Sequence, residues 1–161
     1  MAENSETKNK LRRPKMPRPR GYENYKFPFT VEKPWGKEVW LELWQGQRGH
    51  GYCYKRIYIR KGTKTSLQFH KRKIETNYII KGKAEVWLEN DSGNIIKKKI
   101  GTGSSFTIIP PRKHRVIALT NVILQEVSTP DVDDIIRLQD DAGRGNGRIE
   151  SEHSKIKHGI F

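Results

Sequence analysis

Cysteine and long apolar runs are both scarce in this sequence of 161 residues. The one cysteine, Cys53, has no partner for an internal disulfide. No stretch reaches the roughly 18 consecutive apolar residues that a membrane-spanning helix needs, and the basic amino-terminal stretch lacks the apolar core of a secretory signal. These absences predict a cytoplasmic protein in a reducing compartment, with no membrane segment. Because Cys53 lies between two tyrosines, a buried structural thiol is favoured over a reactive nucleophile.

Acidic side chains are also in short supply, with 18 Asp and Glu against 32 Lys and Arg and a net charge of +14. Residues 1–27 hold eight of the basic side chains and three glutamates, which leaves a net charge of +9 on the rest of the chain. Such a positive field favours anionic partners, either phosphorylated small molecules or nucleic acid. Because no RNA-recognition or helix-turn-helix pattern is present, nucleic acid is expected only through the basic amino-terminal arm.

Aliphatic residues are almost absent from residues 1–27, where three prolines stand among the basic side chains. This composition cannot bury enough apolar surface to offset the entropy lost on ordering, which predicts a flexible or extended arm. The arm is either a solvated tail or an anchor for nucleic acid or a partner. The rest of the chain suits one compact domain, expected over residues 28–145, with a charged tail at 146–161. His153, in that tail, is expected to be solvated.

Short apolar segments rich in Ile, Val, Tyr, Trp and Thr alternate with turn signals from about residue 31 onward. This pattern, without any long helical period, predicts an all-β sandwich or barrel. Strands are expected at residues 38–44, 54–60, 66–69, 76–80, 84–89, 95–100, 105–109, 116–119 and 123–127. A hairpin tip is expected at 91–94, and the lysines at 97–99 indicate that the next strand is an exposed edge. Residues 130–138 are expected to form a short helix capped by acidic residues.

Four polar side chains form a candidate metal site. Gln68 and His70 are two residues apart on an expected strand, so both project to the same face. Glu75 follows a short basic turn at residues 71–73 and begins the next strand, and His114 begins a later one. Two imidazoles, a carboxylate and an amide oxygen make a mixed nitrogen and oxygen ligand set. We therefore predict one divalent transition metal, with zinc favoured and manganese, iron, cobalt or nickel as alternatives.

The spacing of these residues resembles the two cupin motifs. Gly62, Gln68, His70, Glu75 and Gly82 follow the first motif, with Gln68 standing where the first histidine would be, and Gly103, Pro110 and His114 follow the second. Further blocks resemble the cupin domain of type II mannose-6-phosphate isomerases: the residues at 31–36, Lys55-Arg56-Ile57, Ser66-Leu67-Gln68-Phe69-His70 and Gly82-Lys83-Ala84. The resemblance implies a cupin jelly-roll barrel and a homodimer, since cupins commonly pair as dimers.

The same resemblance implies a metal-dependent aldose–ketose isomerase that acts on a sugar phosphate. For substrate phosphate or proton transfer it favours Lys55 and Arg137, the latter in a segment after the last expected strand. A dedicated site for an organic cofactor is not expected. Two alternatives share the fold: a non-catalytic cupin that binds a sugar phosphate or sugar nucleotide, and an accessory protein whose metal is structural. Fold alone does not decide among the three.

Overall fold

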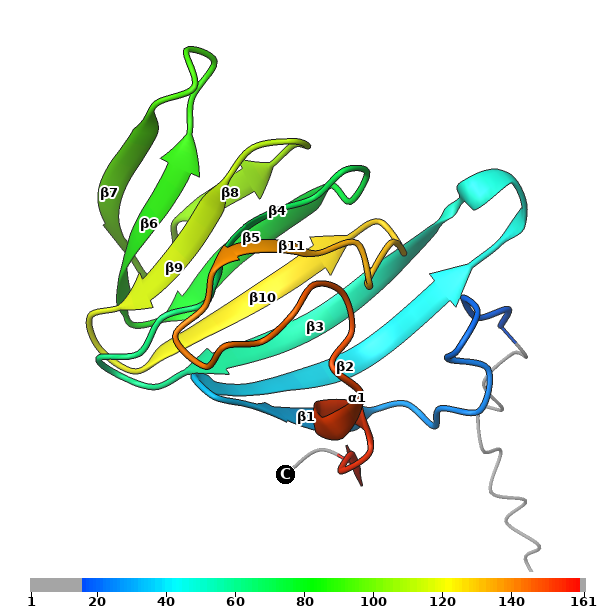
Figure 1. Ribbon diagram of the computed structural model, residues 1–161. Coiled ribbons are helices and arrows are strands. Elements are labelled where there is room, and N and C mark those ends of the chain that lie inside the picture. Colours follow the sequence, from blue (N-terminus) through cyan, green and yellow to red (C-terminus); the bar gives the residue numbers. More distant parts are fainter. Residues whose placement is uncertain (1–15, 160–161) are drawn as a thin grey trace, which may run out of the picture.

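A computed structural model describes residues 16–159 as two antiparallel β-sheets packed against each other (Figure 1). The seven-stranded sheet has the order β12 (Lys157–His158), β1 (Phe29–Lys33), β2 (Gly36–Gln45), β3 (Gly51–Ile59), β10 (Val122–Ser128), β5 (Glu75–Lys81) and β8 (Ser105–Ile108). The five-stranded sheet has the order β11 (Ile136–Gln139), β4 (Leu67–Phe69), β9 (His114–Ala118), β6 (Lys83–Glu89) and β7 (Ile95–Gly101). A short 3₁₀ helix, Gln47–Gly49, and α1 (Glu150–His153) complete the elements. The expected all-β cupin fold is confirmed.

Alternation along the strands separates the interior from the surface. In β3, Cys53, Lys55 and Ile57 are buried, and the residues between them are only partly buried. One apolar cluster lies between the two sheets and includes Ile79 and Val86. A second cluster lies around Phe29 and Trp40, at the β1 and β2 end of the molecule, and contains the buried thiol of Cys53. Burial raises the pKa of that thiol to about 12, which favours a structural rather than a nucleophilic cysteine.

Each of the nine expected strands is present, with ends displaced by a few residues. The strand that carries the three lysines, β7, is the last in its sheet, which agrees with the predicted exposed edge. The short helix expected at 130–138 is wrong, because these residues form turns that lead into β11. The acidic side chain of Asp134 does not cap its own segment. It accepts hydrogen bonds from the backbone N–H groups of Arg72 at 2.6 Å and Lys73 at 3.0 Å.

The amino-terminal segment is packed on the barrel wherever the structure describes it. Tyr22 is 1% exposed, and its ring stacks on Trp40 with centroids 5.5 Å apart. Its hydroxyl donates to Asp133 at 2.7 Å. The flexible arm predicted up to residue 27 is therefore wrong for Tyr22 and its aromatic neighbours Tyr25 and Phe27, which pack against the Phe29 cluster. Aromatic rings supply the apolar surface that the lack of aliphatic residues concealed. Residues 1–15 of the predicted arm lie outside the described residues.

The carboxy-terminal tail also folds back on the barrel, as Figure 1 shows for α1 beside β1. Glu152 pairs with Lys33 at 2.7 Å and with Arg144 at 3.3 Å, and β12 pairs with β1. His153 is 5% exposed and packs edge-on against Trp40, with centroids 5.6 Å apart. The expectation of a solvated His153 is therefore wrong, because its ring completes the aromatic cluster. None of the helices within residues 16–159 is long and apolar enough to cross a membrane.

His153 predicts a stability that depends on pH. Burial, together with the cations of Lys33 and Arg148, lowers the pKa of His153 to about 3. The unfolded chain therefore takes up the proton first, and the free energy of unfolding falls as pH drops from about 6.5 towards 3. We expect this histidine to account for roughly 2 kcal/mol of lost stability at pH 5 relative to pH 7. Denaturant unfolding at the two pH values measures the loss, and His153→Phe should make the difference smaller. An unchanged difference would contradict the assignment.

Candidate metal centre

The predicted ligands come together between the two sheets. Gln68 on β4 lies directly opposite His114 on β9, so that both side chains share the inner face of the five-stranded sheet. His70 follows β4 by one residue. Glu75 begins β5 in the other sheet and reaches the same place from the opposite side. These four residues therefore lie near one another in the interior between the sheets.

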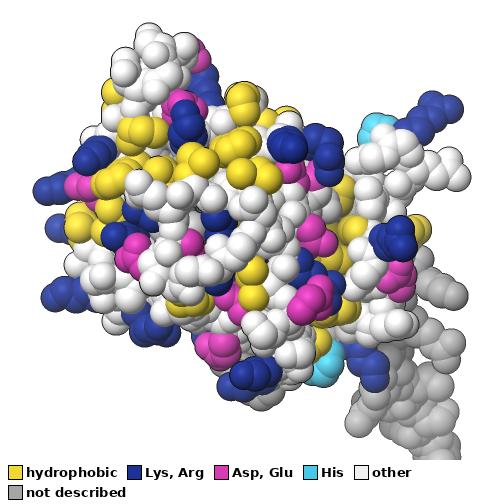
Figure 2. Space-filling model, in the orientation of Figure 1, with side chains coloured by type: hydrophobic (Ala, Val, Ile, Leu, Met, Phe, Trp, Pro, Cys, Tyr) yellow, Lys and Arg dark blue, Asp and Glu magenta, His cyan; other side chains and the backbone are white. Residues whose placement is uncertain are grey.

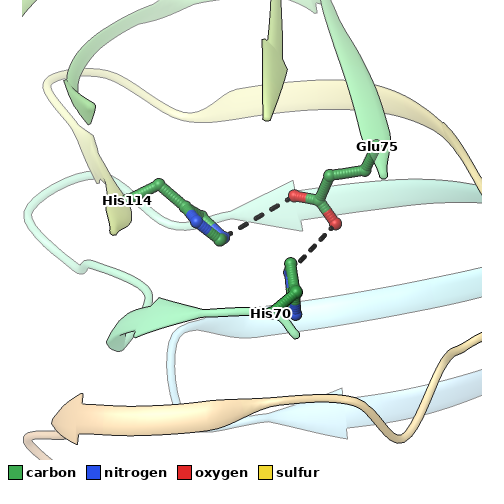
Figure 3. A group of neighbouring side chains, drawn as sticks. All are labelled: His70, Glu75 and His114. Atoms are coloured by element: carbon green, nitrogen blue, oxygen red, sulfur yellow. Dashed lines mark ion pairs between the residues drawn. The ribbon is translucent and has the colours of Figure 1, made fainter. Parts of the chain in front are cut away.

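His70, Glu75 and His114 form a buried group that could hold a metal ion, with one ligand atom from each lying within 4.8 Å of the others. Figure 3 shows both imidazoles turned toward the carboxylate, with His70 Nε2 3.5 Å from Glu75 Oε2 and His114 Nε2 3.7 Å from Glu75 Oε1. Ligands of a first-row ion lie about 2.0–2.2 Å from it, so neighbouring ligands are roughly 3–3.5 Å apart. The three residues therefore need only small movements to surround an ion.

Backbone carbonyl groups fix both imidazoles in the orientation that a metal ligand needs. Nδ1 of His70 donates to the carbonyl oxygen of Asp134, and Nδ1 of His114 donates to that of Arg112 at 3.1 Å. Both Nε2 lone pairs then face the centre. Burial lowers the pKa of His114 to about 4, which keeps that ring neutral and able to ligate. Nε2 of His70 is buried with no hydrogen-bond partner among the described residues, as expected for an atom that serves an ion.

Gln68 lies beside this group in a different orientation from the predicted one. Its Oε1 accepts a hydrogen bond from Ser66 Oγ at 2.5 Å, and its Nε2 donates to His114 Nε2 at 3.3 Å. The amide therefore presents nitrogen to the centre. A half-turn about the last side-chain bond would present the oxygen instead and leave Nε2 to donate to Ser66. The three residues of the buried group thus converge directly, and Gln68 requires this rotation to join them.

Sequence reasoning missed a buried lysine at the centre. Lys73 belongs to the basic turn at residues 71–73, yet it is only 4% exposed. Its Nζ donates to Glu75 Oε2 and, at 2.9 Å, to Glu126 Oε1. Burial alone would raise the pKa of Glu75, but the Lys73 ammonium and the two imidazoles hold it well below the usual range. The sequence feature that could have predicted this burial is the two-residue spacing of Lys73 and Glu75, which in an extended chain places both side chains on one face.

The two cations favoured for phosphate contacts both line the cavity beside the candidate centre. Lys55 points inward, with Nζ 3.4 Å from Glu38 Oε2 and 3.8 Å from the centre of the Trp40 ring. Its neighbour Arg56 takes the other face of β3 and bonds Gln125. Arg137 on β11 lies directly opposite Gln68, and its Nη1 donates to the carbonyl oxygens of Gly145 and Gly147. The Nε of Arg137 is buried without a hydrogen-bond partner among the described residues.

The cavity has a volume of about 90 Å³ and is lined by both cations and carboxylates. Six cations and four carboxylates line it: Lys33, Lys55, Lys73, Arg137, Arg144 and Arg148, with Glu38, Glu75, Glu126 and Asp133. Lys33 and Arg144 pair with Glu152, and Arg148 pairs with Glu150, so carboxylates outside the lining neutralise these three cations. On the face drawn in Figure 2, acidic and basic side chains are likewise interspersed. Arg137 forms no ion pair with a carboxylate among the described residues, which makes it the cation of this lining best placed to meet an anion.

Two packed antiparallel sheets with a buried histidine and glutamate group between them define a cupin. Solved structures agree on the fold. The capsular polysaccharide assembling protein CapF of Staphylococcus aureus matches with a TM-score of 0.58 and 14% identity, over 73% of this chain and 33% of that one. Oxalate decarboxylase of Bacillus subtilis matches with a TM-score of 0.58 and 16% identity, over 68% of this chain and 29% of that one. At these identities the likeness shows the fold alone.

The sequence places the chain more narrowly. Residues 20–140 match the family described as "Mannose-6-phosphate isomerase C-terminal", and the chain belongs to that family. A protein of Vibrio cholerae with the name "Putative mannose-1-phosphate guanylyltransferase" is 30% identical over 111 residues, which is 67% of this chain and 22% of that protein. The chain therefore spans about a fifth of the length of this relative. The match that begins at residue 20 includes Tyr22, which agrees with the packed amino-terminal segment.

Proposed function

We propose that this chain is a metal-dependent isomerase that interconverts the aldose and ketose forms of a sugar phosphate. One observation carries the proposal: the buried group of His70, Glu75 and His114 adjoins a cavity lined by Arg137, whose Nε has no described partner, in a chain of the mannose-6-phosphate isomerase C-terminal family. The ligand set supplies neutral imidazole and carboxylate, which suits zinc or manganese. Manganese has a precedent in the fold, since Bacillus subtilis oxalate decarboxylase has Mn(II) centres.

The centre and the cations have separate tasks in this proposal. An ion held by His70, Glu75 and His114 would polarise the carbonyl and hydroxyl oxygens of an open-chain sugar. Arg137 would orient the phosphate, because a guanidinium offers several donors in a fixed plane and its Nε has no described partner. Lys55 would add a second positive charge from the opposite sheet. Burial alone would lower the pKa of Lys55, but the carboxylates of Glu38 and Glu126 raise it, so the lysine remains charged.

Access to the cavity requires movement of its lining. A volume of about 90 Å³ is small beside the roughly 300–1,000 Å³ of common ligand pockets. Gly147, Arg148 and Ile149 line the cavity from the carboxy-terminal segment, which crosses from β11 to α1 (Figure 1). We infer that outward movement of this segment admits the sugar and that its return excludes water from the site.

Activity with mannose 6-phosphate tests the proposal. Metal-loaded protein should interconvert mannose 6-phosphate and fructose 6-phosphate, and unphosphorylated mannose should be a poor substrate. Arg137→Ala should raise KM by about tenfold or more while lowering kcat less, because a phosphate contact made before and during the reaction contributes mainly to binding. Arg56→Ala is the matched control, since Arg56 lies on the outer face of β3, and it should leave both constants unchanged. Equal effects of the two variants would contradict the role of Arg137.

The cavity also favours a second candidate function, a non-catalytic cupin that binds a sugar phosphate or sugar nucleotide. Each of its four carboxylates is already engaged: Glu38 with Lys55, Glu75 and Glu126 with Lys73, and Asp133 with Tyr22. None of them is free to move a proton between sugar carbons in the described arrangement. If calorimetry shows that sugar phosphates bind, and no isomerisation of them is detected, this second function is favoured over the isomerase.

A further inference from the structure

Lys73 sits in a position that a surface lysine of a turn does not normally take. Its side chain is 5% exposed, and its ammonium lies between two carboxylates that are equally buried, Glu75 on β5 and Glu126 on β10. Lys71, on the same turn, is exposed. Burying an ammonium is costly unless it is paired, so the contacts with both glutamates are what keep Lys73 inside the barrel.

The charge of Lys73 acts on the same carboxylate that would bind the metal. Its Nζ donates a hydrogen bond to Oε2 of Glu75, and Nδ2 of Asn77 donates one to Oε1 at 3.3 Å. The two imidazoles are neutral ligands, so Glu75 and Glu126 supply the negative charge in the immediate surroundings. An ammonium between these glutamates neutralises part of the charge that would attract a divalent ion. It also occupies Oε2 of Glu75, so Oε1, which accepts only the longer hydrogen bond from Asn77 at 3.3 Å, is the oxygen better placed to ligate.

We propose that Lys73 is an internal counter-ion of the metal centre: it holds Glu75 as a ligand through one oxygen, stabilises the metal-free protein and lowers the affinity for the ion. The inference rests on the metal centre of the proposed function but not on isomerase activity. Its consequence is an exchangeable metal, because the site remains neutralised and folded when the ion leaves.

Direct measurement of Mn²⁺ affinity tests this role. Lys73→Met keeps the length of the side chain and removes the charge, and it should bind Mn²⁺ about tenfold more tightly than the native protein in competition with a chromophoric chelator. Lys71→Met, the control from the same turn, should leave the affinity unchanged. Lys73→Arg preserves the positive charge and should stay within about threefold of the native value. If Lys73 served only to fill space, Lys73→Met would show no gain in Mn²⁺ affinity.

Two further results complete the test. In Lys73→Met the metal-free protein carries two buried glutamates without their counter-ion, so Mn²⁺ should raise its melting temperature more than it raises that of the native protein. Glu126→Gln removes one of the two carboxylates that pair with Lys73, so that the ammonium pairs with Glu75 only. This variant should bind Mn²⁺ severalfold more weakly than the native protein, whereas Lys73→Met should bind it more tightly. Unchanged or weaker binding by Lys73→Met would overturn the inference while leaving the metal centre intact. Failure of all five proteins to bind Mn²⁺ would overturn the centre and the inference together.

Discussion

His70→Ala should abolish stoichiometric metal binding. We expect the native protein to bind about one transition metal ion per chain when the ion is supplied, and His70→Ala to lose at least about a hundredfold in affinity, because a site with so few protein ligands cannot compensate for one of them. His114→Ala should behave in the same way. Metal content by elemental analysis and the metal-induced shift in melting temperature both measure the loss.

His50→Ala is the matched control for these two variants. His50 is exposed, in the loop before β3, and it takes no part in the buried group. Its replacement should leave metal content and the melting shift unchanged. Full retention of metal by His70→Ala would show that the ion, if any, binds elsewhere. Loss of metal by His50→Ala as well would show that the assay reports general destabilisation instead of ligation.

The position of the metal group follows from local rules that the sequence makes visible. A strand period of two places Gln68 and His70 together, and the turn at 71–73 is short enough for Glu75 to return toward them. The position of His114 depends on the pairing of β4 with β9, which brings together residues that are 46 positions apart in the sequence. Only the resemblance to the cupin motifs predicted that His114 joins the group. The orientation of the Gln68 amide depends on Ser66 and His114, and no sequence rule specifies it.

Residues missed by sequence reasoning are those whose burial depends on distant partners. Lys73 looks like its neighbours in a basic turn until Glu126, 53 positions away, is placed opposite it. The segment at 130–138 has the acidic pattern of a helix start, but Asp134 binds the backbone of residues 71–73 instead. Composition also failed to predict the packing of the amino-terminal segment. The segment lacks aliphatic residues, but its three aromatic rings pack against a cluster whose other members lie far away in the sequence.

Tyr22→Ala should destabilise the protein by about 3–5 kcal/mol, as for other large aromatic side chains removed from a core. The ring is buried between Trp40 and Tyr25, so its loss leaves a cavity at the end of the barrel. Tyr22→Phe keeps the ring and removes only the hydrogen bond to Asp133, which should cost about 1–3 kcal/mol because the carboxylate loses its donor. Tyr52→Ala is the control, since Tyr52 is 38% exposed, and it should cost clearly less. Urea unfolding at pH 7 gives all three values. A Tyr22→Ala protein as stable as Tyr52→Ala would mean that this segment does not pack on the barrel in solution.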